Sequence, residues 1–152
     1  MIKDAVSPLE PRYEDLAGDG LGRKARRHFL ATRPKFLTAS VLPVLVGTAW
    51  GATLAGGLQA GVALLALLAT ALVHCASNVI NDVGDDITGT DRDNVDYIHP
   101  YTGGSRFITN GIMSVREMHR WGWILIGMAS VLGLALALLK GPIVIALGLA
   151  GI

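Results

Sequence analysis

The chain has 152 residues, of which 51% are hydrophobic and only 16% are charged. About 25% charged residues is usual in soluble domains, so this composition excludes an ordinary soluble domain. The formal net charge of +1 says little about partners, because the charges are segregated along the chain, and the single cysteine, Cys75, excludes a disulfide framework or a thiolate metal cluster.

The N-terminal segment is polar and contains prolines and glycines, so we expect no cleavable signal peptide in it. We expect a disordered cytoplasmic tail over residues 1–22. We expect residues 23–152 to form the N-terminal part of a transmembrane bundle, beginning with a short basic helix at the membrane surface over residues 24–35.

Three segments that follow contain no charged residue: 36–58, 59–77 and 121–139. Each is close to the roughly 20 residues that a helix needs to cross a bilayer. A fourth apolar segment, 143–152, is about half that length. The predicted fold class is therefore all-α: a polytopic transmembrane helical bundle with about three full spans and a partial fourth.

The connections between these spans carry recognisable signals. Gly56 and Gly57 predict a tight turn, and Gly141 with Pro142 predicts another. Between the second and third spans lies a polar loop, residues 89–113. Ser114 and Glu117 have the spacing of a capping box, so the third helix is predicted to begin at Ser114.

The charges indicate an orientation in the membrane. If three segments span, 12 of the 13 Lys and Arg residues and all 12 Asp and Glu residues lie on one side. Basic residues close to span ends mark that side as cytoplasmic. We therefore expect a multi-pass protein of the cell membrane, with the N-terminus and the aspartate-rich loop in the cytoplasm. Beside a span, such a basic cluster indicates topology and not nucleic-acid binding.

Carboxylates appear abruptly where the second span ends. Residues 36–81 contain no charge, yet three of the next five residues are Asp82, Asp85 and Asp86. If the helix continues through them, residues at intervals of three and four share one face. That face would carry His74, Asn78, Asn81, Asp82 and Asp85.

Carboxylates one turn apart repel each other unless a cation lies between them. Mg²⁺ prefers oxygen ligands and is typically held by one or two carboxylates together with substrate phosphates. The absence of cysteine from the cluster argues against zinc. The spacing after Asp91 does not fit an EF-hand. The alternative is a solvated helix end without a metal.

The loop could supply complementary positive charge. Residues 102–106, Thr-Gly-Gly-Ser-Arg, offer backbone N–H groups, the Ser105 hydroxyl and the Arg106 guanidinium, which suit phosphate oxygens. The same stretch could be an ordinary turn. Arg33 and Lys35 precede the first span and could serve the site or only the topology. His74 could be a structural residue.

The motif resembles that of a known family. Asn78-x-x-Asn81-Asp82-x-x-Asp85, followed by Gly-Thr-Asp91, is similar to the first aspartate-rich motif of the UbiA superfamily of intramembrane aromatic prenyltransferases. Residues 33–35, 39–48 and 102–106 resemble the branch that contains 1,4-dihydroxy-2-naphthoate polyprenyltransferases of menaquinone biosynthesis. The third motif position of the superfamily is Gly89 here, and that branch places an Asp two residues later, at Asp91.

The resemblance implies Mg²⁺-dependent transfer of a polyprenyl group from its diphosphate to an aromatic acceptor such as 1,4-dihydroxy-2-naphthoate, inside the lipid bilayer. The expected catalytic residues are Asp82 and Asp85, and the expected metal ligands are Asn81, Asp82, Asp85 and Asp91. The expected substrate-binding residues are Asn78, Arg106, Ser105, Arg33, Lys35 and His74.

The alternatives concern what the chain does by itself. The superfamily carries a second aspartate-rich motif that these 152 residues lack, so we expect an N-terminal half or a subunit that needs a partner chain. A truncated noncatalytic membrane protein and a UbiA-type enzyme with another aromatic acceptor are the other readings. A CDP-alcohol phosphatidyltransferase is discounted, since the Asp19-Gly20 pair lies far from any span.

Overall fold

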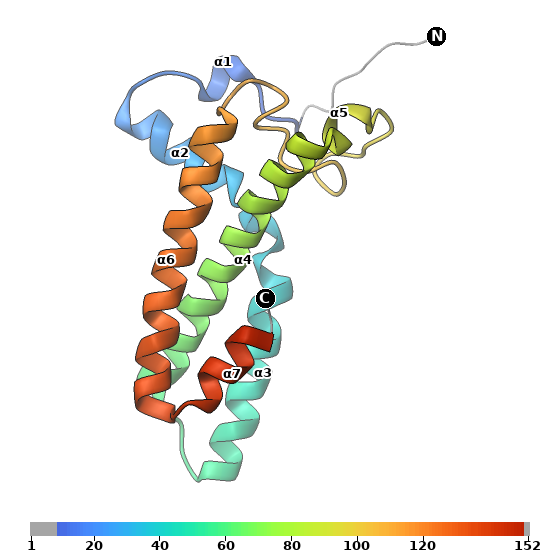
Figure 1. Cartoon of the computed structure of the whole chain (residues 1–152). Helices are drawn as coiled ribbons and strands as arrows, with labels where there is room; N and C mark the ends of the chain where they lie inside the picture. The colour runs from blue at the N-terminus through green and yellow to red at the C-terminus, as the bar shows by residue number, and fades with distance from the viewer. Residues whose placement is uncertain (1–8, 151–152) are drawn as a thin grey trace. The chain divides into compact units, whose positions relative to one another are not determined.

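The computed structural model describes residues 9–150, and every regular element in that range is a helix (Figure 1). The all-α, membrane-spanning fold expected from the sequence is therefore confirmed. In chain order the elements are α1 (Tyr13–Leu16), α2 (Leu21–Ala31), the 3₁₀ turn η1 (Pro34–Phe36), α3 (Leu37–Ala55), α4 (Ala60–Thr88), α5 (Thr90–Asp93), α6 (Val115–Lys140) and α7 (Ile143–Ala150).

Three segments are long and apolar enough to cross a membrane: Pro34–Ala55, Ala60–Thr88 and Val115–Lys140. Their mean hydropathies are 1.5, 2.0 and 2.2. Large apolar side chains on these helices are exposed, for example Trp50 at 69% and Leu138 at 81%. Such surface is costly in water and suits hydrocarbon. The three predicted spans are confirmed, and α7 is the shorter helix expected after them.

The described chain falls into two compact units. One combines the residues up to Pro34 with Ser77–Gly122, and the other combines Lys35–Ala76 with the residues from Trp123 onward. Buried side chains of the first unit include Val79, Phe107, Met113 and Met118. All the predicted site residues belong to the first unit except Lys35 and His74.

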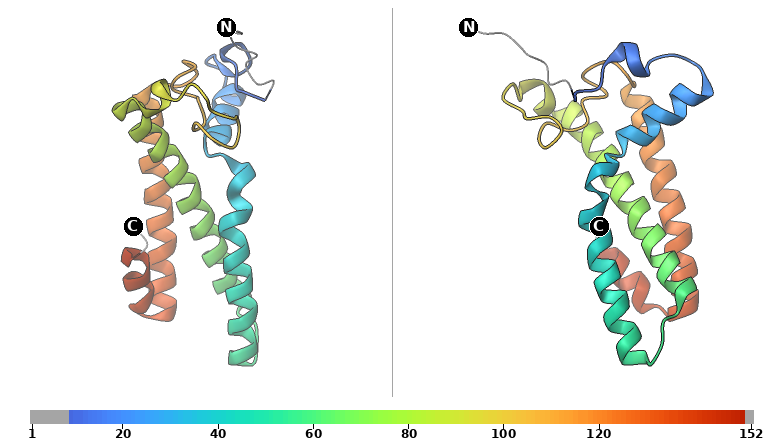
Figure 2. Two further views of the ribbon diagram at one scale, coloured as in Figure 1. Left: turned by 90° about the vertical axis from the view of Figure 1, so that its right-hand side faces the viewer. Right: turned by 180° about the vertical axis from the view of Figure 1, so that it is seen from behind.

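In the second unit, α3 and the first part of α4 run antiparallel from a tight turn (Figure 2). Gly56 takes the left-handed conformation (φ 71°) that ends α3, as the paired glycines predicted. Ser40 Oγ lies 2.8 Å from Nδ1 of His74. His74 thus has the structural partner that the sequence analysis allowed, and its substrate-binding role stays a prediction.

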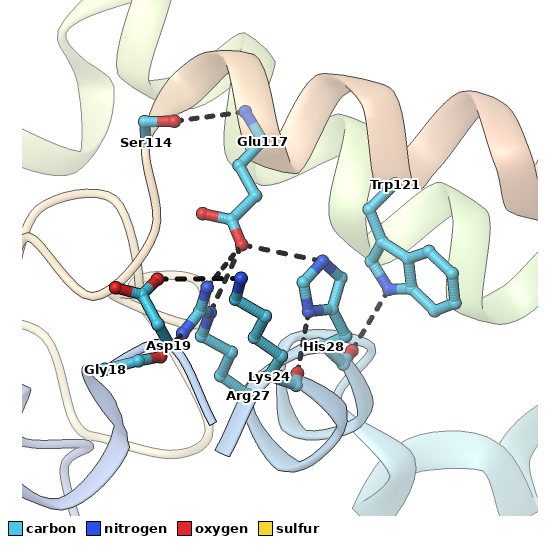
Figure 3. Close-up of polar contacts among 8 residues, drawn as sticks. All are labelled: Gly18, Asp19, Lys24, Arg27, His28, Ser114, Glu117 and Trp121. Carbon is cyan, nitrogen blue, oxygen red and sulfur yellow. Dashed lines mark hydrogen bonds and ion pairs between the residues drawn. The ribbon is translucent and has the colours of Figure 1, made fainter. Parts of the chain in front are cut away.

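In the first unit, α2 is fastened to the start of α6 (Figure 3). Nη2 and Nε of Arg27 donate to Oε1 of Glu117 at 2.9 and 3.2 Å, and Nη1 donates to the Gly18 carbonyl at 2.7 Å. The Trp121 indole donates to the His28 carbonyl at 3.1 Å, and the two rings meet edge to face. These contacts fix the end of α2, from which the chain passes to Arg33.

The start of α6 agrees with the predicted capping box. The Glu117 amide donates to Ser114 Oγ at 3.2 Å, so Ser114 caps the helix. The Glu117 carboxylate, however, accepts from Arg27 on α2. Glu117 was expected to act only at the end of its own helix, but it also joins α6 to α2.

The N-terminal segment contains more structure than a tail. Its first eight residues lie outside the described range, while residues 9–22 include α1 and a buried carboxylate, Glu10. The basic helix expected over 24–35 runs over Leu21–Ala31 instead. It ends there because Pro34 disfavours helical backbone in the residue before it.

Candidate functional site

Asp82 is one of two carboxylates of α4 that face the packed interior of the first unit; the other is Asp86. Asp82 is 3% exposed and shares the buried face of the helix with Val79, Val83 and Asp86. The spacing of these residues, three or four apart, explains why they share a face. The Ser105 amide donates to both carboxylate oxygens of Asp82, at 3.1 and 3.3 Å. The loop therefore folds back onto the acidic end of α4.

Asp91 reaches the same region from the next element. Gly89 leaves α4 with φ 82°, which turns the chain into the single helical turn α5. Asp91 is 5% exposed. Burial raises the pKa of the Asp91 carboxyl, and the nearby Asp85 carboxylate raises it further, while Arg106 opposes the shift. Asp91 thus brings a buried carboxylate from a second helix to the region of Asp82.

Gly104 shows how close the two acids come. A Cβ atom added there would lie 2.8 Å from Oδ1 of Asp82 and 3.0 Å from Oδ2 of Asp91. Both carboxylates therefore border one small space, which exists because residue 104 has no side chain. The φ of Gly104 is +70°, a conformation that other residues rarely adopt.

Arg106 places positive charge beside these acids. Its side chain is mostly buried, and Nη1 donates to the Asp91 carbonyl. The guanidinium carbon lies 4.1 Å from the centre of the Tyr97 ring, a cation–π contact. Its Nε has no partner among the described residues. The guanidinium is thus held in place with an N–H group left to donate to an anion.

Arg33 enters the region from the end of α2. Its Nη2 donates to the Pro100 carbonyl at 3.3 Å, and Asn78 Nδ2 donates to the carbonyl of the preceding Thr32 at 3.2 Å. Arg33 (φ 55°) and Arg106 (φ 63°) are the two non-glycine residues with positive φ between residues 9 and 150. Left-handed backbone costs energy and persists where the surroundings enforce it, often at functional sites.

The structure brings together five of the predicted residues: Asp82, Asp91, Ser105, Arg106 and Arg33. Asn78 is linked to this group by its hydrogen bond to the carbonyl of Thr32, the residue before Arg33. On α4, Asp85 is half-buried and Asn81 is exposed, beside the face that Asp82 occupies. Lys35 and His74 belong to the second unit, and their proposed roles remain predictions.

Three residues of this region were not included in the predicted site: Asp86, Glu10 and Tyr97. Asp86 is 6% exposed and pairs with Arg92 at 2.9 Å. Glu10, in the N-terminal segment, accepts a hydrogen bond from the hydroxyl of Tyr97, which belongs to the loop. The helical spacing of Asp86 from Val79 and Val83 could have indicated its burial, whereas no local signal marks Glu10, which lies 87 residues before Tyr97.

The donor set fits a hard divalent cation. The space beside Gly104 is bordered by two buried carboxylates, the oxygen ligands that Mg²⁺ prefers. Within the described range, no group of three or more His, Cys, Asp or Glu side chains is arranged to hold a metal. Two carboxylates without a closed protein cage match the usual arrangement of Mg²⁺, whose other ligands are waters and substrate phosphates.

Residues 40–152 match the UbiA prenyltransferase family. The chain belongs to this family. Together with its three apolar helices, membership identifies a multi-pass membrane protein of the UbiA prenyltransferase family. The matched residues include α4, α5 and the loop before α6, whereas Glu10, α2 and Arg33 precede them.

Three similar proteins are named 1,4-dihydroxy-2-naphthoate octaprenyltransferase. That of Escherichia coli (strain K12) is 36% identical over 68% of this chain and 32% of its own length. That of Haemophilus influenzae is 34% identical over 74% and 34%, and that of Mycobacterium tuberculosis is 34% identical over 76% and 37%. The chain thus spans about a third of the length of these curated relatives. No solved structure matches it.

Proposed function

We propose that this chain carries the first aspartate-rich half-site of a Mg²⁺-dependent polyprenyltransferase. The donor would be a polyprenyl diphosphate and the acceptor 1,4-dihydroxy-2-naphthoate, as in menaquinone biosynthesis. The observation that carries the proposal is the pair of buried carboxylates, Asp82 and Asp91, which border one space beside Gly104. Family membership and the names of the similar proteins support the reaction and the acceptor.

The residues of the site suit the recognition of a diphosphate. Asp82 and Asp91 would hold Mg²⁺, and Asp85 and Asn81, also on α4, would be the other protein ligands. When bound, the metal would neutralise charge on the leaving diphosphate and act as a Lewis acid. Arg106 and Arg33 would donate to the remaining phosphate oxygens, because guanidinium groups match phosphate geometry.

The transfer needs two bonds broken and one bond formed. The allylic C–O bond of the donor breaks, and its electron pair leaves on the diphosphate. The ring carbon that bears the carboxylate then attacks the allylic cation and forms the new C–C bond. The bond from this carbon to the carboxylate breaks, CO₂ leaves, and the electron pair of that bond returns to the aromatic ring. The chain's own part is to fix the diphosphate through its arginines and to stabilise the charge that develops there.

A glycine pair offers a matched test of the site. In the complete protein that contains this half-site, reconstituted in a membrane, Gly104→Ala would fill the space between Asp82 and Asp91, while Gly111→Ala would have a similar backbone cost (φ +68°) with nothing within 4 Å of the added methyl. We expect Gly104→Ala to lower Mg²⁺-dependent prenyl transfer on the order of 100-fold and Gly111→Ala to leave it nearly unchanged. Isotope-labelled donor would report the transfer.

Comparable losses in the two variants would mean that strain alone limits activity and would contradict the proposed site. The variant Asp85→Asn distinguishes a loss of catalysis from a failure to insert into the membrane. It should reach the membrane in normal amounts and lack prenyl transfer. Wild-type turnover by Asp85→Asn would remove this residue from the machinery.

A further inference from the structure

Glu10 is a buried carboxylate in the segment that precedes the family match. It is 7% exposed, and both of its oxygens are used. Oε2 accepts from the Tyr97 hydroxyl at 2.8 Å, and Oε1 accepts from Nδ2 of Asn110 at 2.9 Å. The same Asn110 nitrogen donates to the Pro11 carbonyl at 2.9 Å. Burying a carboxylate is costly unless it is hydrogen-bonded, so these bonds fasten the N-terminal segment to the loop.

Tyr97 connects this carboxylate to the candidate site. Its hydroxyl donates to Glu10, while its ring face lies 4.1 Å from the guanidinium carbon of Arg106. Burial and the hydrogen bond to Glu10 raise the pKa of Tyr97, so the phenol stays protonated and remains a donor. A Cβ atom at Gly103 would lie 2.6 Å from Cβ of Tyr97, which shows that the loop closes directly over this residue.

Arg106 is therefore held from two sides. Tyr97 packs against its guanidinium, and the Asp91 carbonyl accepts from Nη1. Ser105, one residue earlier, donates its amide to Asp82. A shift of Tyr97 would consequently reach the Arg106 guanidinium and the Ser105–Asp82 bond together.

We propose that Glu10 is a positioning residue for the diphosphate site: it orients Tyr97, and Tyr97 orients the Arg106 guanidinium. The inference rests on the proposed function, because it assigns Arg106 to phosphate oxygens. It extends the site beyond residues 40–152, to a part of the chain that lies outside the family match. Glu10 itself touches neither the donor nor the acceptor.

The test measures the affinity of the full chain, in lipid nanodiscs, for inorganic pyrophosphate with Mg²⁺. Glu10→Gln removes the charge, and Tyr97→Phe removes only the hydroxyl, so that the aromatic ring is retained but Glu10 no longer orients it. We expect Glu10→Gln to weaken binding about tenfold, because the Tyr97 ring is then no longer held against the guanidinium, and Tyr97→Phe to weaken it by a similar factor. Glu14→Gln, at an exposed acid of α1, is the control and should bind as the wild type does.

A double-mutant cycle separates positioning from general stability. In an Arg106→Gln background the guanidinium is gone, so Glu10→Gln should cause no further loss of pyrophosphate affinity. If the losses add, or if Glu10→Gln and Tyr97→Phe bind pyrophosphate as tightly as the wild type, the inference is overturned. Thermal melts of each variant identify any that do not fold. If Glu10→Gln does not fold, Tyr97→Phe, the milder substitution, still tests the inference.

The two proposals fail differently. A wild-type chain that does not bind Mg²⁺-pyrophosphate removes the proposed function, and with it the site that Glu10 would position. A wild-type chain that binds, together with variants that bind equally well, leaves the diphosphate site intact and removes the role of Glu10 alone.

Discussion

At the scale of single residues, the two arginines show where the site departs from relaxed backbone. Arg33 and Arg106 both have positive φ. The guanidinium group of each lies near buried carboxylates. Among L-residues this conformation costs roughly 1–2 kcal/mol. A sequence optimised only for stability would place glycine at such positions. We therefore infer that arginine occupies these two positions because of the contacts that its side chain makes.

Arg33 allows the strain and the side chain to be separated. Arg33→Gly and Arg33→Ala both remove the guanidinium, but only glycine relaxes the backbone at φ 55°. We expect both variants to lose pyrophosphate affinity equally, while Arg33→Gly is about 1 kcal/mol more stable than Arg33→Ala. Denaturation in mixed micelles measures the difference. Equal stabilities would show that residue 33 carries no strain.

Local patterns predicted some of these residues and missed others. The helical spacing around Asp82 predicted its place at the end of α4, because it depends only on residues within two turns. The approach of Asp91 to Asp82 depends on the left-handed turn at Gly89 and on a loop that folds back to Ser105. The bond from Tyr97 to Glu10 joins residues 87 apart, and nothing in the intervening sequence indicates it.

At the scale of elements, α4 and α6 pack closely at a glycine. A Cβ atom at Gly122 would lie 2.4 Å from Cδ1 of Ile80 and 2.8 Å from its Cγ1. Small residues at a helix contact let two backbones approach. The composition predicted both helices, but it did not predict which of the glycines on α6 marks the contact.

Two glycines of α6 give a controlled test of this packing. Gly122→Ala should destabilise the protein by about 1–3 kcal/mol, because Ile80 must move. Gly127 has nothing within 4 Å of an added Cβ, so Gly127→Ala should be neutral or stabilising by up to about 1 kcal/mol. Thermal denaturation in detergent compares the two. A neutral Gly122→Ala would mean that the helices are not tightly packed there.

At the scale of the whole molecule, the hydrophobic runs predicted the three spans well, since span length is set by the bilayer and not by long-range contacts. The orientation in the membrane rests on the distribution of basic residues and remains a prediction. It can be tested because the chain has one native cysteine, Cys75, which can be replaced.

In a Cys75→Ala background, single cysteines can be placed at Thr102, in the loop, and at Leu58, in the turn between α3 and α4. Both positions are exposed. A membrane-impermeant maleimide should label Thr102→Cys only in inside-out vesicles and Leu58→Cys only in right-side-out vesicles. Labelling of Thr102→Cys from outside the cell would reverse the predicted topology.

The unequal lengths of α3 and α4 have a consequence for bilayer thickness. Helix α3 has 19 residues, about 28 Å, and none of them is buried within the chain, so α3 matches a hydrocarbon layer of ordinary thickness. Helix α4 has 29 residues, about 43 Å, and exceeds it. In a thicker membrane the acidic end of α4 would emerge less far from the headgroups, and hydrophobic mismatch would then govern how readily a water-borne cation reaches Asp82.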